Sequence, residues 1–221
     1  MTRLRGEDGV GLVELVIALA LMTIVAGIAY AGLGSFVTSS KAIDDRALAT
    51  DATRTALERI VRDLRAANPI DALPGATPVS AYDTAVSFSV HCSPAGTGTC
   101  NAQGLRPLRY ETVAGELRRT EGGVTSALLR PTGPTSVPLT VRAGAIVNTA
   151  AEPVFAYYDV AGDPLVTSGP DAVTSTLVRD CARTVEVHLR VQAQDRDADA
   201  IVDLRTRVDI RNFHEVSSCT A

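Results

Sequence analysis

Residues 9–40 read GVGLVELVIALALMTIVAGIAYAGLGSFVTSS, and this long apolar stretch decides the fold. Glu14 is its single charged residue. The run from Leu15 to Val37 has no charge and is long enough to cross the hydrocarbon core of a membrane. An unpaired carboxylate at the start of such a run is costly, so by default it marks a function that involves a partner. We therefore expect a membrane-spanning helix whose first turn contains a functional carboxylate.

The residues on either side of this run indicate its orientation. Arg3 and Arg5 precede it and favour a cytoplasmic N-terminus, although Glu7 and Asp8 dilute that signal. All cysteines follow the run, in turn-rich surroundings that suit disulfides in an oxidising compartment. They are Cys92, Cys100, Cys181 and Cys219. Both observations predict a single-pass protein with its C-terminal part outside the cytoplasm.

Two other interpretations of the segment remain open at this point. A plain membrane anchor explains the apolar run but gives no reason for Glu14. A secretory signal peptide explains the two arginines, and Ala29-Tyr30-Ala31 supplies a cleavage site of the A-x-A type. However, the apolar run continues beyond that site through Leu33, Phe36 and Val37. A signal peptide also has no need of a carboxylate near the start of its apolar core.

The start of the run resembles the class III signal of type IV prepilins and pseudopilins. The residues that carry the resemblance are Gly9, Val10, Gly11, Leu12, Val13, Glu14 and Leu15. The resemblance implies that a prepilin peptidase cuts after Gly9 and methylates the new amine of Val10. It also implies that Glu14 is the assembly carboxylate. A carboxylate near an ammonium inside the bilayer neutralises it, within one chain or on the next subunit.

The segment departs from the family pattern at several positions. Val10 stands where the family most often has Phe, and Gly11 where Thr is common. Ala31 occupies the place of a proline found in many major pilins. Three glycines could supply local flexibility instead, or permit close packing of helices, and both interpretations stay open. They are Gly27, Gly32 and Gly34.

Helical spacing continues beyond the apolar run, from residue 41 to Asn68, where Asn68-Pro69 predicts the end of the helix. One apolar stripe is expected to pack on a β-domain, and it consists of Leu57, Ile60, Val61 and Leu64. Opposite charges four residues apart can form pairs along the other face. These pairs are Glu58 with Arg62, and Arg59 with Asp63.

After Pro69, prolines and glycines separate short alternating runs, which is typical of a β-domain with long loops. The expected strands are 85–91, 108–113, 116–120, 139–141, 154–159, 184–193 and 201–212. The last two form a hairpin around the charged residues 195–199. We favour a disulfide between Cys92 and Cys100 across a Gly-rich loop, and one between Cys181 and Cys219 at the open end of the hairpin. Four cysteines allow three pairings, and free thiols or a metal site are the alternatives.

Two further stretches resemble the J-type minor pseudopilins of type II secretion and the related PilW-like minor pilins. They are residues 57–67, and residues 154–162 together with Arg211-Asn212-Phe213. Residues 69–150 add little to this resemblance. In the K-type tip subunit the family pattern usually lacks the glutamate that Glu14 represents here, so Glu14 argues against that subtype.

Other chemistry finds little support in the sequence. Asp195, Asp197 and Asp199 alternate as in a calcium loop, but the glycine of the sharp turn is missing and Thr206 replaces the bidentate glutamate. His91, His188 and His214 are scattered, and His188 is expected on the polar surface of a strand. The formal net charge of −4 gives no footprint for nucleic acid. We expect no enzyme, cofactor or metal site.

The sequence thus predicts an α+β, pilin-like fold with four parts: residues 1–9 as leader, 10–37 as membrane span, 38–68 as amphipathic helix and 69–221 as extracytoplasmic β-rich domain. The expected function is that of a minor pseudopilin or minor pilin that initiates or caps a type II secretion pseudopilus or type IV pilus. Its partners are then other pilins, the prepilin peptidase and the inner membrane. The alternative is an anchored adhesin or a DNA-uptake pilus subunit, the one case in which nucleic acid binding is expected.

Overall fold

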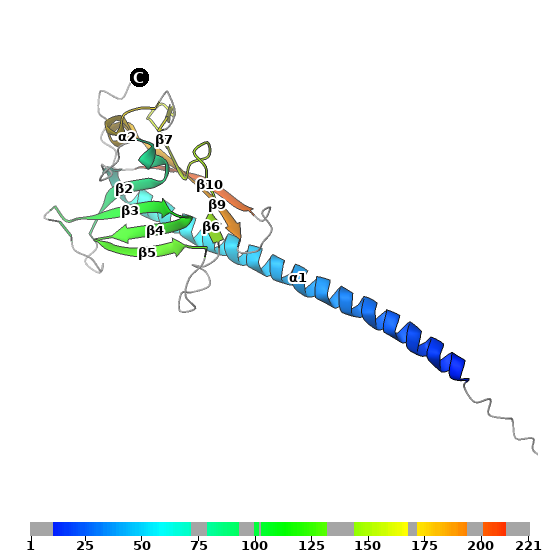
Figure 1. The fold of residues 1–221 in the computed structure, drawn as a ribbon. Helices are drawn as coiled ribbons and strands as arrows, with labels where there is room; N and C mark the ends of the chain where they lie inside the picture. The colour runs from blue at the N-terminus through cyan, green and yellow to red at the C-terminus, as the bar shows by residue number, and fades with distance from the viewer. Residues whose placement is uncertain are drawn as a thin grey trace, which may run out of the picture. The chain divides into compact units, whose positions relative to one another are not determined.

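The computed structural model describes residues 11–71, 79–92, 100–101, 103–131, 144–167, 172–193 and 201–210. The chain divides into two compact units, Met1–Asp44 and Asp45–Ala221. Helix α1 (Leu12–Arg65) supplies all the described secondary structure of the first unit and the first element of the second (Figure 1). The fold is α+β, as the sequence predicts: a long helix followed by two antiparallel sheets.

In the first unit, every residue of α1 whose burial is described is exposed, up to Asp44. The side chains from residue 12 to 37 are mostly apolar, and no described residue buries those whose exposure is described. One polar side chain of this part is satisfied within the helix, because the Thr23 hydroxyl donates to the carbonyl of Ala20 at 2.8 Å. One helix among the described residues is long and apolar enough to cross a membrane, and it is α1.

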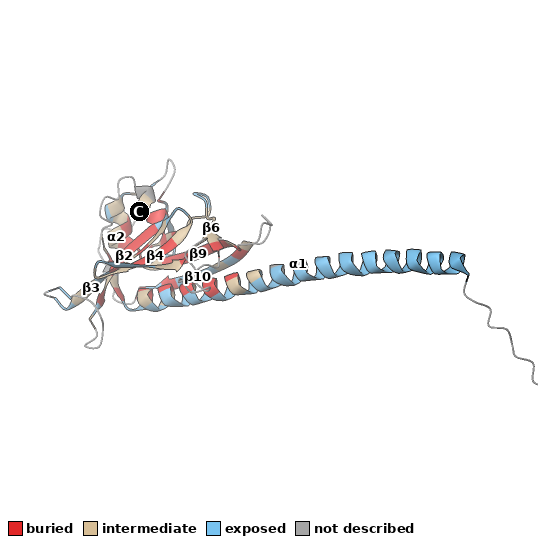
Figure 2. Cartoon of the chain, turned by 60° about the horizontal axis from the view of Figure 1, so that its bottom comes forward, coloured by how far each residue is buried: buried red, intermediate tan, exposed pale blue. Residues whose placement is uncertain are grey.

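In the second unit, α1 has a buried stripe at helical spacing (Figure 2). The stripe consists of Ala49, Ala52, Thr53, Ala56, Ile60 and Leu64. Leu57 and Val61, which the sequence assigns to the stripe, are half-buried along its flank. The N-terminal part of the stripe, residues 49–56, is mostly alanine, and this small side chain lets the helix backbone lie close to the sheets.

The first sheet is a five-stranded antiparallel meander in chain order. Its strands are β1 (Ala67–Ile70), β2 (Ala85–His91), β3 (Leu105–Val113), β4 (Glu116–Glu121) and β5 (Val124–Leu129). The short 3₁₀ helix η1 (Val79–Asp83) precedes β2. The turn between β3 and β4 contains Gly115 at φ +76°, a conformation that glycine adopts without strain.

The second sheet has the order β10-β9-β7-β8, with β6 on the same edge of β9 as β7. Its strands are β6 (Gly144–Ile146), β7 (Phe155–Tyr158), β8 (Pro164–Leu165), β9 (Thr184–Ala193) and β10 (Ile201–Asp209). Helix α2 (Ser175–Cys181) leads into β9, and Thr174 caps its N-terminus. The predicted hairpin is present, with Val202 opposite Val191 and Val208 opposite Val185. Residues 139–141 and 195–199 lie outside the described residues.

The predicted end of α1 at Asn68 is wrong. The helix ends at Arg65, and Ala67–Ile70 form strand β1 even though Pro69 lies within it. β1 is an edge strand with a register irregularity against β2, so the missing N–H of the proline breaks no regular ladder. The strand forms despite the proline because the side chains of Ala67 and Ile70 are buried in the core.

Candidate membrane and assembly segment

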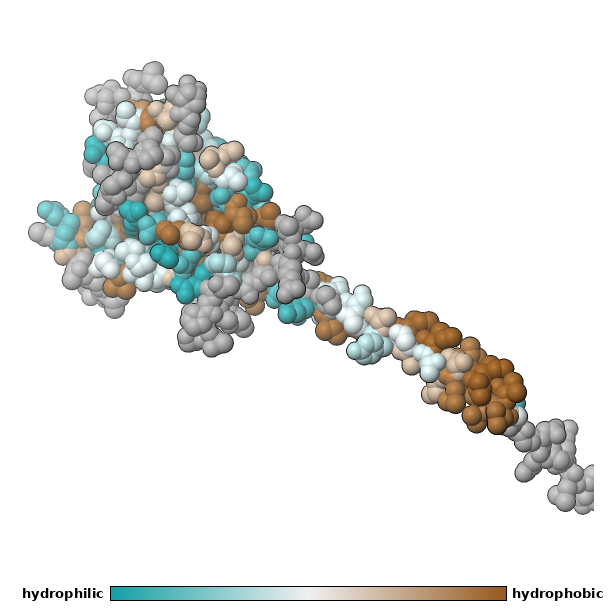
Figure 3. All heavy atoms as spheres, in the orientation of Figure 1, coloured by the Kyte–Doolittle hydropathy of each residue, from teal (hydrophilic) through white to brown (hydrophobic). Residues whose placement is uncertain are grey.

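The first unit presents an apolar surface on all sides of α1. Figure 3 shows these apolar side chains gathered on the first part of the helix, whereas the second unit has a mixed surface. Leu12, Ile28 and Phe36 are 81%, 69% and 72% exposed. The run from Leu15 to Val37 extends about 35 Å at about 1.5 Å per residue, which exceeds a hydrocarbon core of about 30 Å. Such a surface needs lipid or other apolar helices around it.

Glu14 lies in the first turn of this helix. The backbone N–H groups of Glu14 and Leu15 donate to the carbonyl of Gly11 at 2.9 and 3.2 Å, which starts the helical hydrogen bonding. The Glu14 side chain has no hydrogen bond or ion pair with any described residue, and its neighbours one turn on, Ile17 and Ala18, are apolar and exposed. The positive end of the helix dipole favours an acid here, but the carboxylate still requires a counter-charge in a membrane.

Gly9 and Val10 lie outside the described residues, so the predicted cleavage and methylation positions remain predictions. Their place in the chain is nevertheless informative. They directly precede Gly11, whose carbonyl accepts the first helical hydrogen bonds. An amine created at Val10 would therefore stand four residues before Glu14 in the sequence.

The second part of α1 is attached to the first sheet through a partly buried ion pair. Asp63 Oδ2 accepts hydrogen bonds from Arg119 Nε at 2.9 Å and from the Tyr110 hydroxyl at 2.5 Å. Arg119 also pairs with Glu121. Burial, with the Asp63 carboxylate nearby, raises the pKa of the Tyr110 phenol well above its usual value. The predicted pair of Arg59 with Asp63 is wrong, because Asp63 faces the sheet.

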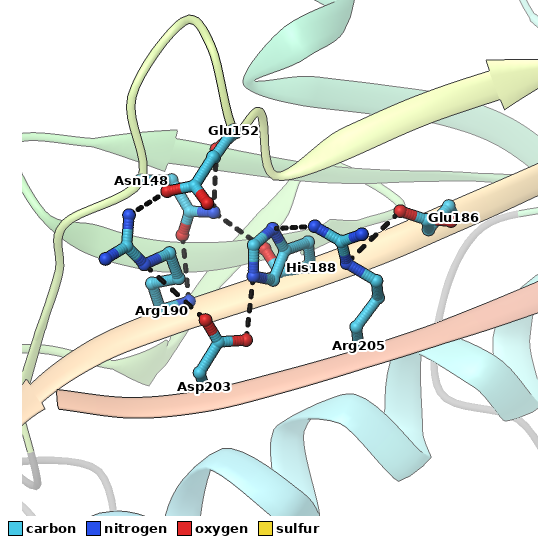
Figure 4. A network of polar contacts seen from close by, with 7 residues as sticks. All are labelled: Asn148, Glu152, Glu186, His188, Arg190, Asp203 and Arg205. Carbon is cyan, nitrogen blue, oxygen red and sulfur yellow. Dashed lines mark hydrogen bonds and ion pairs between the residues drawn. The ribbon is translucent and has the colours of Figure 1, made fainter. Parts of the chain in front are cut away.

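The outer face of the second sheet contains a polar network that the sequence does not reveal (Figure 4). His188 is predicted at the surface, yet it is 3% exposed. Its Nε2 lies 2.8 Å from Asp203 Oδ1, and Arg205 donates to Nδ1 at 3.3 Å. Because arginine only donates, the neutral ring carries its proton on Nε2. The backbone of His188 is bonded to an earlier segment of the chain, because its carbonyl accepts from the Asn148 amide and its N–H donates to the carbonyl of Val154.

Asn148 explains how β6 and β7 can share one edge of β9. Its side-chain amide donates to the carbonyl of His188 and accepts from the N–H of Arg190, both at 3.0 Å. The side chain thus replaces a peptide group in the gap between the two short strands. Glu152 pairs with Arg190 from the same segment. This arrangement positions polar groups for stability, and it presents no nucleophile with a base.

The cysteines agree with an oxidised domain. Cys92 and Cys100 form a disulfide with their Cα atoms 6.3 Å apart, as the sequence favours. Cys181, buried in α2, is also disulfide-bonded. Cys219 lies outside the described residues, so its predicted pairing with Cys181 remains a prediction. His214 and residues 211–213 lie there too. Among the residues with described positions, no group of three histidine, cysteine or acidic side chains could hold a metal ion.

Comparison with protein families identifies the prokaryotic N-terminal methylation motif at residues 4–30. The matched residues include Glu14 and most of the apolar run. Searches of curated proteins and of solved structures found no match. The motif supports a type IV pilin-like subunit that a prepilin peptidase processes and that assembles with other pilins. Together with the apolar helix, it supports a single-pass membrane anchor.

Proposed function

We propose that this protein is a minor pseudopilin or minor pilin that helps to initiate or cap a filament in the inner membrane. The observation that carries the proposal is Glu14: it is the one charged residue in the exposed, mostly apolar part of α1 from residue 12 to 37, inside a matched methylation motif. A plain anchor has no use for this carboxylate. A filament subunit uses it to select a partner of opposite charge.

In the proposed mechanism, a prepilin peptidase cuts after Gly9 and methylates the amine of Val10. The new ammonium and the Glu14 carboxylate are each costly in the hydrocarbon core, and pairing removes much of that cost. The pair can form within one chain or between neighbouring subunits. Apolar contact along residues 15–37 then holds the helices together.

The second unit would lie outside the cytoplasm, where Cys92 and Cys100 can be oxidised. Arg3 and Arg5 on the other side of the apolar run favour the same orientation. The ion pair of Asp63 with Arg119 holds the last turns of α1 against the first sheet. The β-domain is therefore fixed to the same helix that enters the filament.

A J-type or PilW-like identity is the finer part of the proposal. The sequence of α1 near Asp63 and the β7 region around Tyr157 supports it by resemblance, and Glu14 argues against a K-type tip subunit. The genes next to the one for this protein would distinguish a secretion pseudopilus from a type IV pilus. Deleting those of each candidate system in turn would show which one incorporates this subunit.

The test replaces Glu14 and follows incorporation into filaments by cross-linking in native membranes. Glu14→Ala should reduce incorporation by about tenfold or more, because the counter-charge of the partner amine is lost. Glu58→Ala is the matched control, since Glu58 is an exposed carboxylate of the same helix outside the apolar run. Equal incorporation of Glu14→Ala and wild type would show that the carboxylate has no role in assembly.

A further inference from the structure

Strand β10 has an outer edge that pairs with no strand in the described part of the chain. On its inner edge, the N–H of Ile210 donates to the carbonyl of Arg183 at 2.9 Å. Antiparallel pairing repeats this pattern at every second residue of β10. The backbone N–H and C=O groups of Asp203, Arg205 and Arg207 therefore point away from β9. They form a ladder that another strand can bond.

A groove of about 490 Å³ lies between this strand and the last turns of α1. Figures 2 and 4 both place α1 alongside β10. The apolar lining consists of the half-buried Leu57 and Val61, and Thr206 lines the groove from β10. Inward-pointing side chains of an added strand would enter this groove, because alternate residues of a strand face opposite sides.

Two arginines at the groove lack a counter-charge. Arg62 and Arg65 are exposed and have no hydrogen bond or ion pair with any residue whose position is described. The third charged residue of the lining, Glu58, is bonded to Arg54 at 3.0 Å. Arg62 and Arg65 also suit the negative end of the helix dipole, but that interaction leaves their guanidinium groups open to a ligand.

The outer face of the same strand is also rich in arginine. Arg205 and Arg207 share one carboxylate, Glu186, at 3.3 and 2.6 Å. Asp203 and Asp209 lie on this face as well. Asp203 pairs with His188 and Arg190, and Asp209 accepts a hydrogen bond from Thr184. The charges of this face are therefore balanced within it, and the positive charge that is open to a partner comes from Arg62 and Arg65 on α1.

We propose that the groove between α1 and β10 binds an extended segment of another polypeptide that alternates apolar and acidic side chains and adds to β10 as a strand. The backbone ladder supplies binding energy, and the side chains supply selectivity. Apolar side chains cover Leu57 and Val61, and acidic ones reach Arg62 and Arg65. Charges at sheet edges prevent unselective pairing, so only a complementary strand is accepted. Neither cleavage after Gly9 nor pairing by Glu14 is needed for this binding.

The test uses the full chain in detergent micelles and a labelled nine-residue peptide of alternating valine and glutamate. Fluorescence anisotropy measures its affinity, with a valine–lysine peptide as the probe of opposite charge. The acidic peptide should bind, and the basic peptide should bind at least about tenfold more weakly. Equal binding of both peptides, or no binding of the acidic one, would overturn the proposal.

Charge-reversal variants locate the binding site. Arg62→Glu and Arg65→Glu should each weaken binding of the acidic peptide by about tenfold. Arg59→Glu makes the same charge change on the same helix but lines a different groove, beside β5. It should change the affinity by less than about twofold. If all three variants lost the same affinity for the acidic peptide, the effect would come from the net charge of the protein and not from the groove. This result would contradict the proposal.

A proline variant tests strand addition itself. Arg207→Pro removes an outward N–H without breaking the ladder to β9, and Arg207→Ala removes the same side chain while keeping that N–H. Binding to Arg207→Pro should be clearly weaker than to Arg207→Ala, and the peptide should slow amide exchange in β10. Equal affinities with unchanged exchange would exclude strand addition. A dimer of this chain that Arg62→Glu dissociates would assign the groove to a second copy and also overturn the proposal.

Discussion

Residues 12–44 and 45–65 of α1 share one backbone conformation, but among the side chains whose burial is described only those of the second group include buried ones. In the first group, side chains such as Ile28 are apolar and exposed all round the helix. In the second, Ile60 and Leu64 are buried while charged residues occupy the opposite face. The comparison teaches that helix formation alone does not decide what a helix does. The distribution of polar side chains decides whether it meets lipid or a protein core.

The largest expected effect comes from placing a charge in the buried stripe. Ile60→Asp should destabilise the β-domain by more than about 4 kcal/mol, because it buries an unpaired carboxylate. Ile28→Asp introduces the same group in the other region and should leave domain stability unchanged while weakening membrane insertion. Thermal unfolding followed by circular dichroism, together with carbonate extraction of membranes, measures both. If Ile28→Asp lowered the domain's melting temperature equally, the two regions would not be independent.

Breaking the partly buried ion pair of α1 should have the next largest effect. Arg119→Ala leaves the partly buried carboxylate of Asp63 without its main counter-charge and should cost about 2–3 kcal/mol, less than a fully buried pair would. Asp63→Asn with Arg119→Met removes both charges and should be less destabilising than Arg119→Ala alone. Chemical denaturation gives the free energies of unfolding. A double variant less stable than the single one would contradict this account of the pair.

Alkaline pH should lower the free energy of unfolding through the Tyr110 hydroxyl of the same contact. The pKa of Tyr110 is raised in the folded protein, so unfolded chains lose this proton near pH 10 while folded chains retain it. The unfolded state then binds fewer protons, and stability falls as pH rises above about 10. Tyr110→Phe should make this fall shallower. Denaturant titrations between pH 8 and about 11.5 test this. An identical pH dependence in Tyr110→Phe would show that Tyr110 does not contribute.

The smallest effect is expected at the exposed pair of α1. Arg54 bonds to Glu58 at 3.0 Å, but both side chains are mostly exposed. Arg54→Ala should therefore change the free energy of unfolding by less than about 0.5 kcal/mol. The denaturation assay used for Arg119→Ala is sufficient. A loss as large as that of Arg119→Ala would mean that burial does not govern these ion pairs.

Features encoded by neighbouring residues were predictable from the sequence. The apolar run, strand β2 and the β9–β10 hairpin each follow from a local pattern of side chains. Glu14 could be singled out because one charge in an apolar run is conspicuous. The disulfide of Cys92 with Cys100 follows from their short separation.

Features that depend on distant residues were not predictable. Asp63 bonds to Arg119, which is 56 positions away, instead of a neighbour on its own helix. The buried His188 side chain bonds to Asp203 and Arg205 of the next strand, and no alternation pattern contains that information. β1 forms around Pro69 because β2 offers an edge, which overrides the usual meaning of proline.

The most direct test of the central claim is the intact mass of the protein from its native membrane, with peptide mapping of its N-terminus. The account predicts a chain that begins at methylated Val10 and retains Glu14. A chain beginning at Gly32 would indicate release by signal peptidase after Ala31 and would contradict a filament subunit. An intact Met1 would equally contradict it and leave a plain membrane anchor.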